Sequence, residues 1–469
     1  MHRILTMHLT GRPSAHLPRH LSASVSALAL AASVASAGGH AMDAADLQAA
    51  LDAGGTVIVT GPVASDTTLT YSGTDPLTIV GGGNTITMSA NADILAITEG
   101  ADVTITGLAL VGPGGFSIEN RGDMDGPAGK GLFVRVPEDA TGTVSVSLTD
   151  VSVAGVANHG IHVSDCSLAD ACGGGGGGAG EGSAASISLA IAGVTVDAAG
   201  TGAFDADGLR VDERGAGSIL FTAANSTFTN VGADGIELDE GQEGDVIVTA
   251  VGLNAVTNGN YCDPAILNTF LPDPAEGEFE AGAFAEADVP PAVTGSPDDT
   301  CIEREVDLHD DGSVEEFAFG LDLDDGFDID EAGPGSIHAA FILGDITGNL
   351  DEGLDFDEED AGDIRLYVNA LSADGNTDDA IKFTEEGPGD GIVEIVASRV
   401  TGNGGPGLVF EEADEGDLIA SVTDVDAQGN DDGETGVEAV QEDDGAGFLT
   451  VRGTVADGFD LEGVELMEN

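Results

Sequence analysis

The sequence predicts an all-β solenoid in which short parallel strands stack in successive coils, and three observations lead to this fold class. A six-residue pattern, seen as GLRVDE at Gly208 and GIELDE at Gly235, recurs at a spacing of 27 residues through the second half of the chain. Gly, Asp, Pro and Asn separate the apolar runs, and aromatic residues make up only 4% of the 469 residues. A fixed period of short alternating segments is typical of stacked repeats and not of a compact globule.

The first 37 residues are predicted to be an export signal. Basic residues precede a small-apolar run, which ends in the cleavage-type pattern Ala35-Ser36-Ala37. No later segment has 18 uninterrupted apolar residues, so no transmembrane segment is expected after signal removal. We therefore expect residues 38–469 to form a single domain that is secreted, whether extracellular, periplasmic or on the cell surface.

The domain is expected to begin with a short amphipathic helix at 43–52, with Asp43 as its N-cap and Leu47 and Leu51 on its apolar face. A helix in this position covers the open edge of the first coil. Apolar runs separated by turn residues then predict strands at 56–59, 68–71, 77–80, 85–88, 94–97 and 103–110.

The repeated pattern predicts which side chains face the interior. It begins with a small residue at Gly131, Gly160, Gly208, Gly235, Gly326, Gly353, Ala380, Gly407, Gly436 and Gly463. Residues one and three places later are mostly apolar, as expected for a strand with one buried face. In three consecutive repeats the second apolar place holds Phe356, Phe383 and Phe410, which we expect to stack as one interior column.

Two other positions recur in each repeat. A glycine nine places after the small residue suits a turn with positive φ, at Gly217, Gly244, Gly335, Gly362, Gly389, Gly416 and Gly445. An asparagine near the end of the repeat can bond its copy in the next coil, at Asn230, Asn258, Asn349, Asn376, Asn403 and Asn430.

Two steps in the repeat are longer than 27 residues, which predicts loop insertions near 166–183 and 261–325. Each insertion carries a pair of cysteines. An even cysteine count in an exported chain favours disulfides, and we expect Cys166 to pair with Cys172 and Cys262 with Cys301.

The charge of the chain excludes some partners. It has 85 acidic and 13 basic residues, a net charge of −72, which repels nucleic acid and anionic membranes and attracts cations. Solubility in a saline medium and specific cation binding both remain open as its cause. The acidic residue five places after the small residue is expected in a solvated turn, with weak Ca²⁺ or Mg²⁺ binding as the alternative, at Asp165, Glu213, Glu240, Glu331, Glu358, Glu385 and Glu412.

The residue two places after the small residue lies between the two inward-facing residues. It is often polar, and it is expected on the outer side of the strand. At this place, Arg210 and Lys382 are expected to pair with Glu237 and Asp355 in the neighbouring repeats. Carboxylates on this side are candidate ligands for calcium (Ca²⁺), a hard cation that prefers oxygen. The candidate metal residues are Asp234, Asp325, Asp328, Glu352, Asp355 and Asp379.

With its short strands, inward aliphatic and Phe stacks, Asn turns and N-terminal capping helix, the chain resembles the right-handed parallel β-helix proteins of the pectin-lyase-like superfamily. The resemblance covers roughly residues 43–469 and implies a substrate groove on the outer side of the repeated strand. The pair Asp378-Asp379 resembles the acid pair of the polygalacturonase-like glycosidases. However, His159-Gly160 lies upstream of this pair, whereas the His-Gly of those enzymes lies downstream, and no Arg-x-Lys follows it.

The sequence leaves two functions open. The first is a non-catalytic surface or extracellular protein that binds cations or glycans such as a polysaccharide. The second is a carbohydrate-active enzyme, a glycosidase that uses outer carboxylates or a Ca²⁺-dependent lyase. No helix is apparent over the last coil at 463–466, so end-to-end self-association is expected to grow as salt screens the acidic charge.

Overall fold

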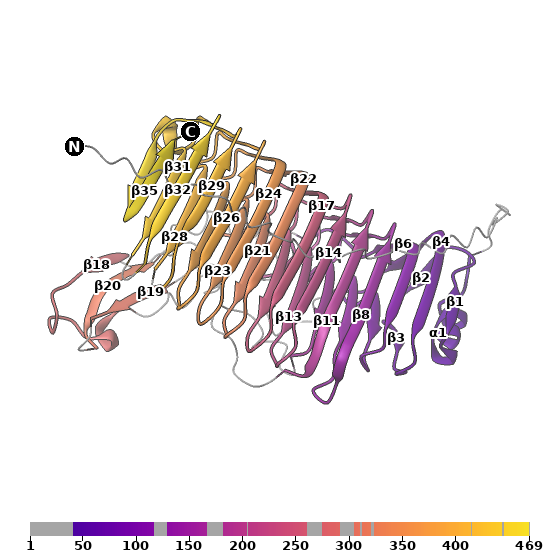
Figure 1. The fold of residues 1–469 in the computed structure, drawn as a ribbon. Coiled ribbons are helices and arrows are strands. Elements are labelled where there is room, and N and C mark those ends of the chain that lie inside the picture. Colours follow the sequence, from indigo (N-terminus) through magenta and orange to yellow (C-terminus); the bar gives the residue numbers. More distant parts are fainter. Residues whose placement is uncertain are drawn as a thin grey trace, which may run out of the picture. The chain divides into compact units, whose positions relative to one another are not determined.

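The protein is a right-handed parallel β-helix, in which each coil of the chain adds one rung to a stack (Figure 1). The computed structural model describes residues 41–116, 129–166, 182–259, 274–290, 304–309, 312–319 and 323–468, apart from 204, 414 and 443–444. The predicted export signal lies outside these residues, as do Cys172, Cys262 and Cys301. In the described part of the chain, no helix has the length and apolar character that a membrane span requires.

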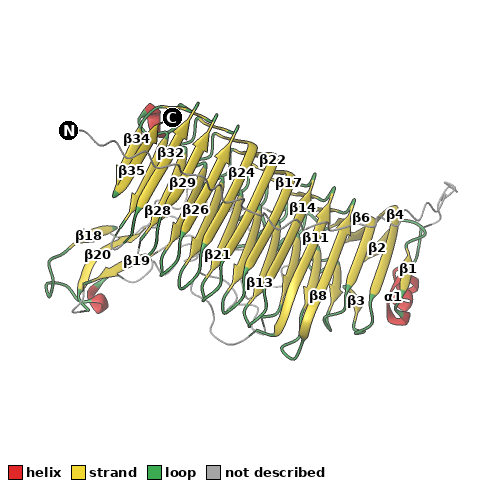
Figure 2. Cartoon of the chain, in the orientation of Figure 1, coloured by secondary structure: helices red, strands yellow, loops and turns green. Residues whose placement is uncertain are grey.

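Two parallel sheets form the walls of the stack (Figure 2). The 12-stranded sheet contains β3 (Leu69–Tyr71), β5 (Leu95–Ile97), β7 (Leu132–Arg135), β10 (Ile161–Ser164), β13 (Leu209–Glu213), β16 (Ile236–Glu240), β21 (Phe327–Glu331), β23 (Leu354–Glu358), β25 (Ile381–Glu385), β28 (Leu408–Glu412), β31 (Val437–Gln441) and β34 (Phe459–Glu462). From β7 to β31, these are the strands of the repeated pattern. The pattern expected at Gly463 is not in this sheet, because its strand, residues 464–468, pairs within the second sheet.

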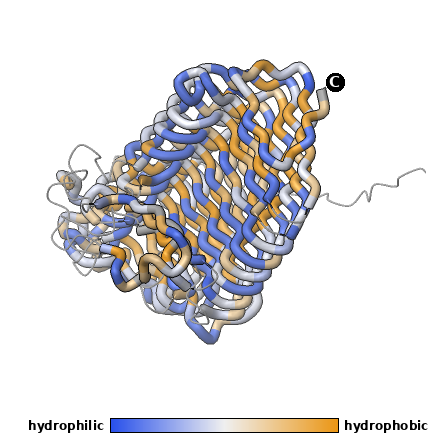
Figure 3. Tube along the Cα trace, turned by 90° about the vertical axis from the view of Figure 1, so that its left-hand side faces the viewer, coloured by the Kyte–Doolittle hydropathy of each residue, from blue (hydrophilic) through white to orange (hydrophobic). Residues whose placement is uncertain are grey.

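The second sheet has 20 strands. They are β1 (Thr56–Ile58), β2 (Val63–Ser65), β4 (Leu77–Met88), β6 (Val103–Val111), β8 (Thr141–Thr149), β9 (Ser152–Ala154), β11 (Ala184–Ala192), β12 (Thr195–Asp197), β14 (Ile219–Ala224), β15 (Thr227–Thr229), β17 (Val246–Val256), β22 (Ile337–Thr347), β24 (Ile364–Asp374), β26 (Gly391–Val396), β27 (Arg399–Thr401), β29 (Ile419–Thr423), β30 (Asp426–Ala427), β32 (Gly447–Arg452), β33 (Val455–Ala456) and β35 (Val464–Glu468). The alternation of apolar and polar residues recurs from rung to rung as bands of orange and blue in Figure 3.

The capping helix is confirmed as α1 (Ala44–Ala53). The Asp43 side chain accepts a hydrogen bond from the Ala45 N–H at 2.9 Å, and Leu47 and Leu51 are buried. The helix contacts β1, β2 and β3, the first strands of both sheets. The strands expected at 77–80 and 85–88 are one strand, β4, which has a register shift between Val80 and Asn84.

The 27-residue period is confirmed by strand register. Leu354 pairs with Ile381, and Ile381 pairs with Leu408. Leu238 pairs with Ile329 in the next rung although the chain between them includes the second insertion. Part of that insertion forms a separate antiparallel sheet, β18 (Glu276–Glu278), β20 (Val314–Phe319) and β19 (Arg304–Leu308), with a short 3₁₀ turn at Glu286–Asp288.

The interior Phe residues are buried as expected, but they do not form one continuous column. Phe383 stacks on Phe410 with ring centroids 5.4 Å apart. Phe356 instead packs against Phe341 of β22, at 5.8 Å between centroids. The aromatic partner of Phe356 therefore lies on the second sheet, which the recurrence of Phe at one place of the repeat could not predict.

The asparagine ladder is confirmed, with one exception. It runs through Asn258, Asn349, Asn376, Asn403 and Asn430. In a typical step, the backbone N–H and Nδ2 of Asn349 both donate to Oδ1 of Asn376, at 3.1 and 3.0 Å. Asn230 is not a member: it is displaced by one residue, because Val231 occupies the ladder position and donates its N–H to Asn258.

The recurrent glycines do not have the positive φ that their turns suggested. Close approach of the neighbouring rung requires them instead. A Cβ on Gly389 would lie 1.5 Å from the carbonyl oxygen of Gly362 and 2.4 Å from Oε1 of Glu385. The same two contacts recur at Gly335, Gly362 and Gly416, so the backbone of each rung packs directly on the one before.

The expectation of a solvated acidic turn is wrong. The acidic residues five places after the small residue are at most 1% exposed, at Asp165, Glu213, Glu240, Glu331, Glu358, Glu385 and Glu412. Strand alternation gives the reason: places one, three and five all face the interior, so the two residues of each acidic pair lie on opposite sides of the strand.

Candidate functional site

The outer side of the 12-stranded sheet holds a cluster of basic, imidazole and carboxylate groups on β7, β10, β13 and β16. In-register pairing aligns Phe133, His162, Arg210 and Glu237 in one row across these strands. Lys130 lies directly before the β7 pattern. Outward-facing polar side chains were predicted from the sequence for this row.

Lys130, His162 and Asp212 form a hydrogen-bonded relay. The Lys130 Nζ contacts Nδ1 of His162, and Nε2 of the same ring lies 2.6 Å from Oδ2 of Asp212. An ammonium or amine donates to Nδ1, so Nδ1 carries the lone pair and the proton sits on Nε2, where it is donated to Asp212. The contacts therefore specify one neutral tautomer of His162.

Burial sets the protonation of this relay. It lowers the pKa of Lys130 to about 8, against the attraction of Asp93 and Asp212. Burial, with the adjacent Lys130 charge, also lowers the pKa of His162 to about 3. The imidazole is therefore neutral at physiological pH, whereas Lys130 exchanges its proton close to that range.

A second imidazole lies beside the relay. The ring centroids of His159 and His162 are 4.6 Å apart. Nδ1 of His159 lies 3.0 Å from the backbone N of Asp207 and 3.1 Å from Oδ2 of the same residue. Burial lowers the pKa of His159 well below its usual value, so it too is neutral.

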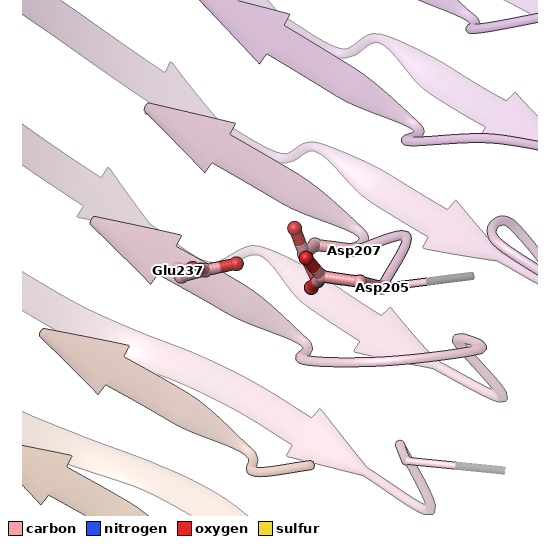
Figure 4. Close-up of side chains that lie close together, drawn as sticks. All are labelled: Asp205, Asp207 and Glu237. Atoms are coloured by element: carbon pink, nitrogen blue, oxygen red, sulfur yellow. The ribbon is translucent and has the colours of Figure 1, made fainter. Parts of the chain in front are cut away.

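Arg210 is held in place by carboxylates on both sides. Its Nε donates to Asp212 at 2.7 Å, and its two terminal nitrogens donate to Glu237 at 2.5 Å and Asp239 at 2.6 Å. The predicted pairing with Glu237 is confirmed. Glu237 also faces Asp205 and Asp207, and the three offer oxygens within 4.8 Å of one another (Figure 4). Because Arg210 is buried among these acids, its charge is neutralised within the protein.

Three of the six residues predicted to bind metal come together further along the sheet. Asp325, Glu352 and Asp355 offer oxygens within 4.8 Å of one another. Lys382 lies among them, with Nζ 2.9 Å from Asp355 and 3.4 Å from Glu352, which confirms the predicted pairing with Asp355. Acidic side chains at this density could hold a metal ion, with Lys382 as a competing internal cation.

The other three candidate ligands lie near the same acids, but among the described residues none of them belongs to a group of three with oxygens within 4.8 Å of one another. Asp234 accepts the backbone N–H of Asp325, which is a structural contact between rungs. Burial, with nearby Asp330 and Asp234, raises the pKa of Asp328 well above its usual value. Burial, with neighbouring Asp378, raises the pKa of Asp379 to about 8, and its Oδ1 is buried with no hydrogen-bond donor among the described residues.

Sequence reasoning missed Lys130 and Asp212. Lys130 directly precedes the small residue of its repeat, as His159 and Asp207 do in later rungs. This shared position could have indicated that the three lie on the same side of the sheet. Asp212 is the first residue of the acidic pair Asp212-Glu213. Because Glu213 faces the interior, Asp212 must face the outer side of the strand. Cys166 is disulfide-bonded, and the predicted pairings remain predictions because the other three cysteines lie outside the described residues.

No model of a protein family matches the sequence, and no curated protein matches it. Three solved structures show similarity at the level of the fold. The enzymatically active domain of tailspike protein 2 from bacteriophage CBA120 is 12% identical, with a TM-score of 0.40, over 80% of this chain and 44% of that chain. This chain therefore spans less than half of the tailspike chain.

The other two are epimerases. The A-module of the mannuronan C-5 epimerase AlgE6 from Azotobacter vinelandii is 13% identical, with a TM-score of 0.37, over 92% of this chain and 93% of that chain. A variant of the periplasmic alginate epimerase AlgG is 10% identical, with a TM-score of 0.40, over 92% and 84%. Similarity this distant carries no information about activity.

Proposed function

We propose that this chain is an exported enzyme that modifies a polysaccharide by moving a proton at the Lys130–His162–Asp212 relay. The observation that carries the proposal is the relay itself, because its contacts specify the tautomer and burial brings a lysine into a working pKa range. The rows of outward side chains extend over many rungs, about 4.8 Å apart, which suits an extended polymer more than a small molecule.

The relay orients the Lys130 amine, which acts as the base. When Lys130 is neutral, one of its N–H bonds still donates to Nδ1 of His162, and the nitrogen lone pair is left to accept a proton from the substrate. His162 and Asp212 act as positioning residues, because they hold the amine and receive no substrate proton themselves. Removing a proton from the carbon next to a sugar carboxylate leads to epimerisation if a proton returns to that carbon from the opposite face. It leads to elimination if the adjacent C–O bond breaks instead, so that a C=C bond forms and the leaving oxygen takes up a proton.

A uronate substrate meets a strongly acidic surface. Arg210 is fully occupied by protein carboxylates, so it offers little charge to a substrate carboxylate. A divalent cation between substrate and protein would supply that charge. The proposed enzyme is therefore expected to need Ca²⁺ or a similar ion for turnover, as the lyase hypothesis from sequence also required.

The test is exchange of the reacting hydrogen. A panel of uronate-containing polysaccharides would be incubated in D₂O with Ca²⁺, and deuterium uptake and unsaturated ends would be measured by mass spectrometry. Lys130→Met should lower exchange by about 100-fold or more. Arg365→Met is the control, because it removes an exposed basic group on β24 of the second sheet and leaves both the relay and the Asp325, Glu352 and Asp355 cluster intact. Wild-type exchange should rise with pH through about 8, as Lys130 loses its proton.

A pH-independent rate, or equal activity in Lys130→Met and the control, would contradict the proposed base. The second candidate is the non-catalytic binding protein, which the Asp325, Glu352 and Asp355 cluster favours. Glycan retention that depends on Ca²⁺ and survives Lys130→Met, without exchange on any polysaccharide tested, would support that function instead.

A further inference from the structure

A column of carboxyl groups runs through the interior of the β-helix, on the side of the sheet opposite to the relay. Six glutamates in six successive rungs are 0% exposed: Glu213, Glu240, Glu331, Glu358, Glu385 and Glu412. Asp165 precedes them in the column and Gln441 follows them. Their strands pair in register, so each carboxyl lies directly above its copy.

The carboxyl groups touch one another. Side-chain hydrogen bonds join Glu213 to both Asp165 and Glu240, and Glu331 to both Glu240 and Glu358. A further hydrogen bond joins Glu385 to Glu358. Two ionised carboxylates have no proton between them and repel, so each contact of this kind requires a proton on one partner.

The surroundings offer little compensation for negative charge. Backbone N–H groups donate to the carboxyls, as from Gln242 to Glu240 at 3.1 Å. Among the described residues, the charged groups that face Glu213, Glu331, Glu358 and Glu385 are other members of the column and Asp360, near Glu358. Arg214 follows Glu213 in sequence, and its guanidinium pairs with Asp239 at 2.8 Å. Both oxygens of Glu213, Glu358 and Glu385 are buried. Backbone hydrogen bonds from Asp360 and Gly387 reach Glu358 and Glu385, and among the described residues the side-chain partners of all three are other carboxyls of the column.

Protons fit this column better than metal ions do. Ca²⁺ takes about six to eight oxygen ligands, whereas each step here offers two carboxyl groups already in direct contact. The carbonyl oxygen of Gly362 approaches the same point beside Gly389 as Oε1 of Glu385, so each step offers two carboxyl groups and one carbonyl, which is still fewer oxygens than Ca²⁺ takes. A shared proton needs only the two oxygens that are present.

We propose that the column alternates between ionised and protonated carboxyl groups, with Glu213, Glu331 and Glu385 holding protons at neutral pH. In this pattern no two ionised members are in contact, and each protonated glutamate lies between two acceptors. The alternation also explains Gln441. It stands at the next place where the pattern requires a neutral group, and its Nε2 donates to the Gly416 carbonyl at 3.3 Å.

The direction of the pKa shifts supports the pattern. Burial and the adjacent carboxyls raise the pKa of Glu213 to about 10, of Glu331 to about 11 and of Glu385 to about 9, from the usual 4.5. Between pH 4.5 and these values, the folded chain holds protons that the unfolded chain releases. Stability is therefore expected to fall as pH rises through this window.

The test compares Glu331→Gln with Glu415→Gln, which changes an exposed glutamate in a turn. Gln is the neutral isostere of a protonated glutamate. Glu331→Gln should therefore fold at pH 7, lose the infrared carbonyl band of one protonated carboxyl, and release about one proton fewer than wild type on unfolding. Glu415→Gln should change neither quantity.

Three results would overturn the proposal. The first is failure of Glu331→Gln to fold at pH 7, since that would mean the position needs a charge. The second is an unchanged band and proton release in that variant. The third is a stoichiometric metal ion that is retained by wild type after dialysis against a chelator and lost in Glu331→Gln, which would assign the column to cations.

Discussion

Replacement of Asn376 by alanine is the sharpest test of how the rungs are joined. The Oδ1 of Asn376 is the acceptor for two donors of Asn349, its backbone N–H at 3.1 Å and its Nδ2 at 3.0 Å. The Nδ2 of Asn376 donates in turn to Asn403 at 3.1 Å. All three residues are at most 2% exposed, so water does not replace the lost partners.

The expected loss of stability follows from these contacts. Alanine leaves two buried donors of Asn349 without an acceptor, at about 1–3 kcal/mol for each, or about 2–6 kcal/mol in total. Asn403 is affected less, because its Oδ1 still accepts the backbone N–H of residue 376. The net effect is a weakened junction between two specific rungs and not a general loosening.

The assay is chemical denaturation of Asn376→Ala beside Asn230→Gly, followed by hydrogen exchange of the rungs on either side. Asn230 is the matched control: it lies outside the ladder, bonds Asp197 at the surface, and has a positive φ of 54° that glycine tolerates. The control should change stability by less than about 1 kcal/mol. Equal effects of the two changes, or unaltered exchange around Asn349, would refute the ladder as a stabilising element.

Three further predictions follow from features described above. Phe383→Ala should cost about 3–5 kcal/mol, because the ring is fully buried against Phe410; denaturation checks this, and a loss below about 1 kcal/mol would contradict close packing there. Millimolar Ca²⁺ should raise the melting temperature more than NaCl of equal ionic strength does, if Asp325, Glu352 and Asp355 bind it; equal rises would indicate screening alone. Light scattering should show end-to-end association that grows with NaCl, and a constant mass up to about 2 M would exclude it.

The fold was readable from the sequence because the period is fixed and strand alternation has only two faces. Asn376 and Phe383 could be placed from spacing alone, since each has a copy 27 residues away. The Asn230 error shows the limit of that reasoning: a residue one place out of phase looks like a member of the ladder until its backbone is placed. Phe356 shows another, because its partner Phe341 belongs to a different wall.

The site was less predictable because its members come from different places in the repeat. Lys130, His162 and Asp212 lie in three rungs at three different offsets from the small residue, so no column of the alignment contains them together. The interior Glu331 was misplaced for a different reason. A charged side chain is normally assigned to solvent, and only its contacts with Glu240 and Glu358 show how it can be buried.

The identical register of successive coils has a consequence for the history of the gene. Because Leu354, Ile381 and Leu408 pair directly, excision or duplication of 27 consecutive residues returns every remaining side chain to the same wall and the same direction. Unequal recombination between repeats can therefore change the length of this protein by whole coils without an intermediate that misfolds. A gain or loss of one residue within a strand would instead turn its buried face outward. Selection should accordingly tolerate length variants in multiples of the coil, and confine irregular insertions to the turns.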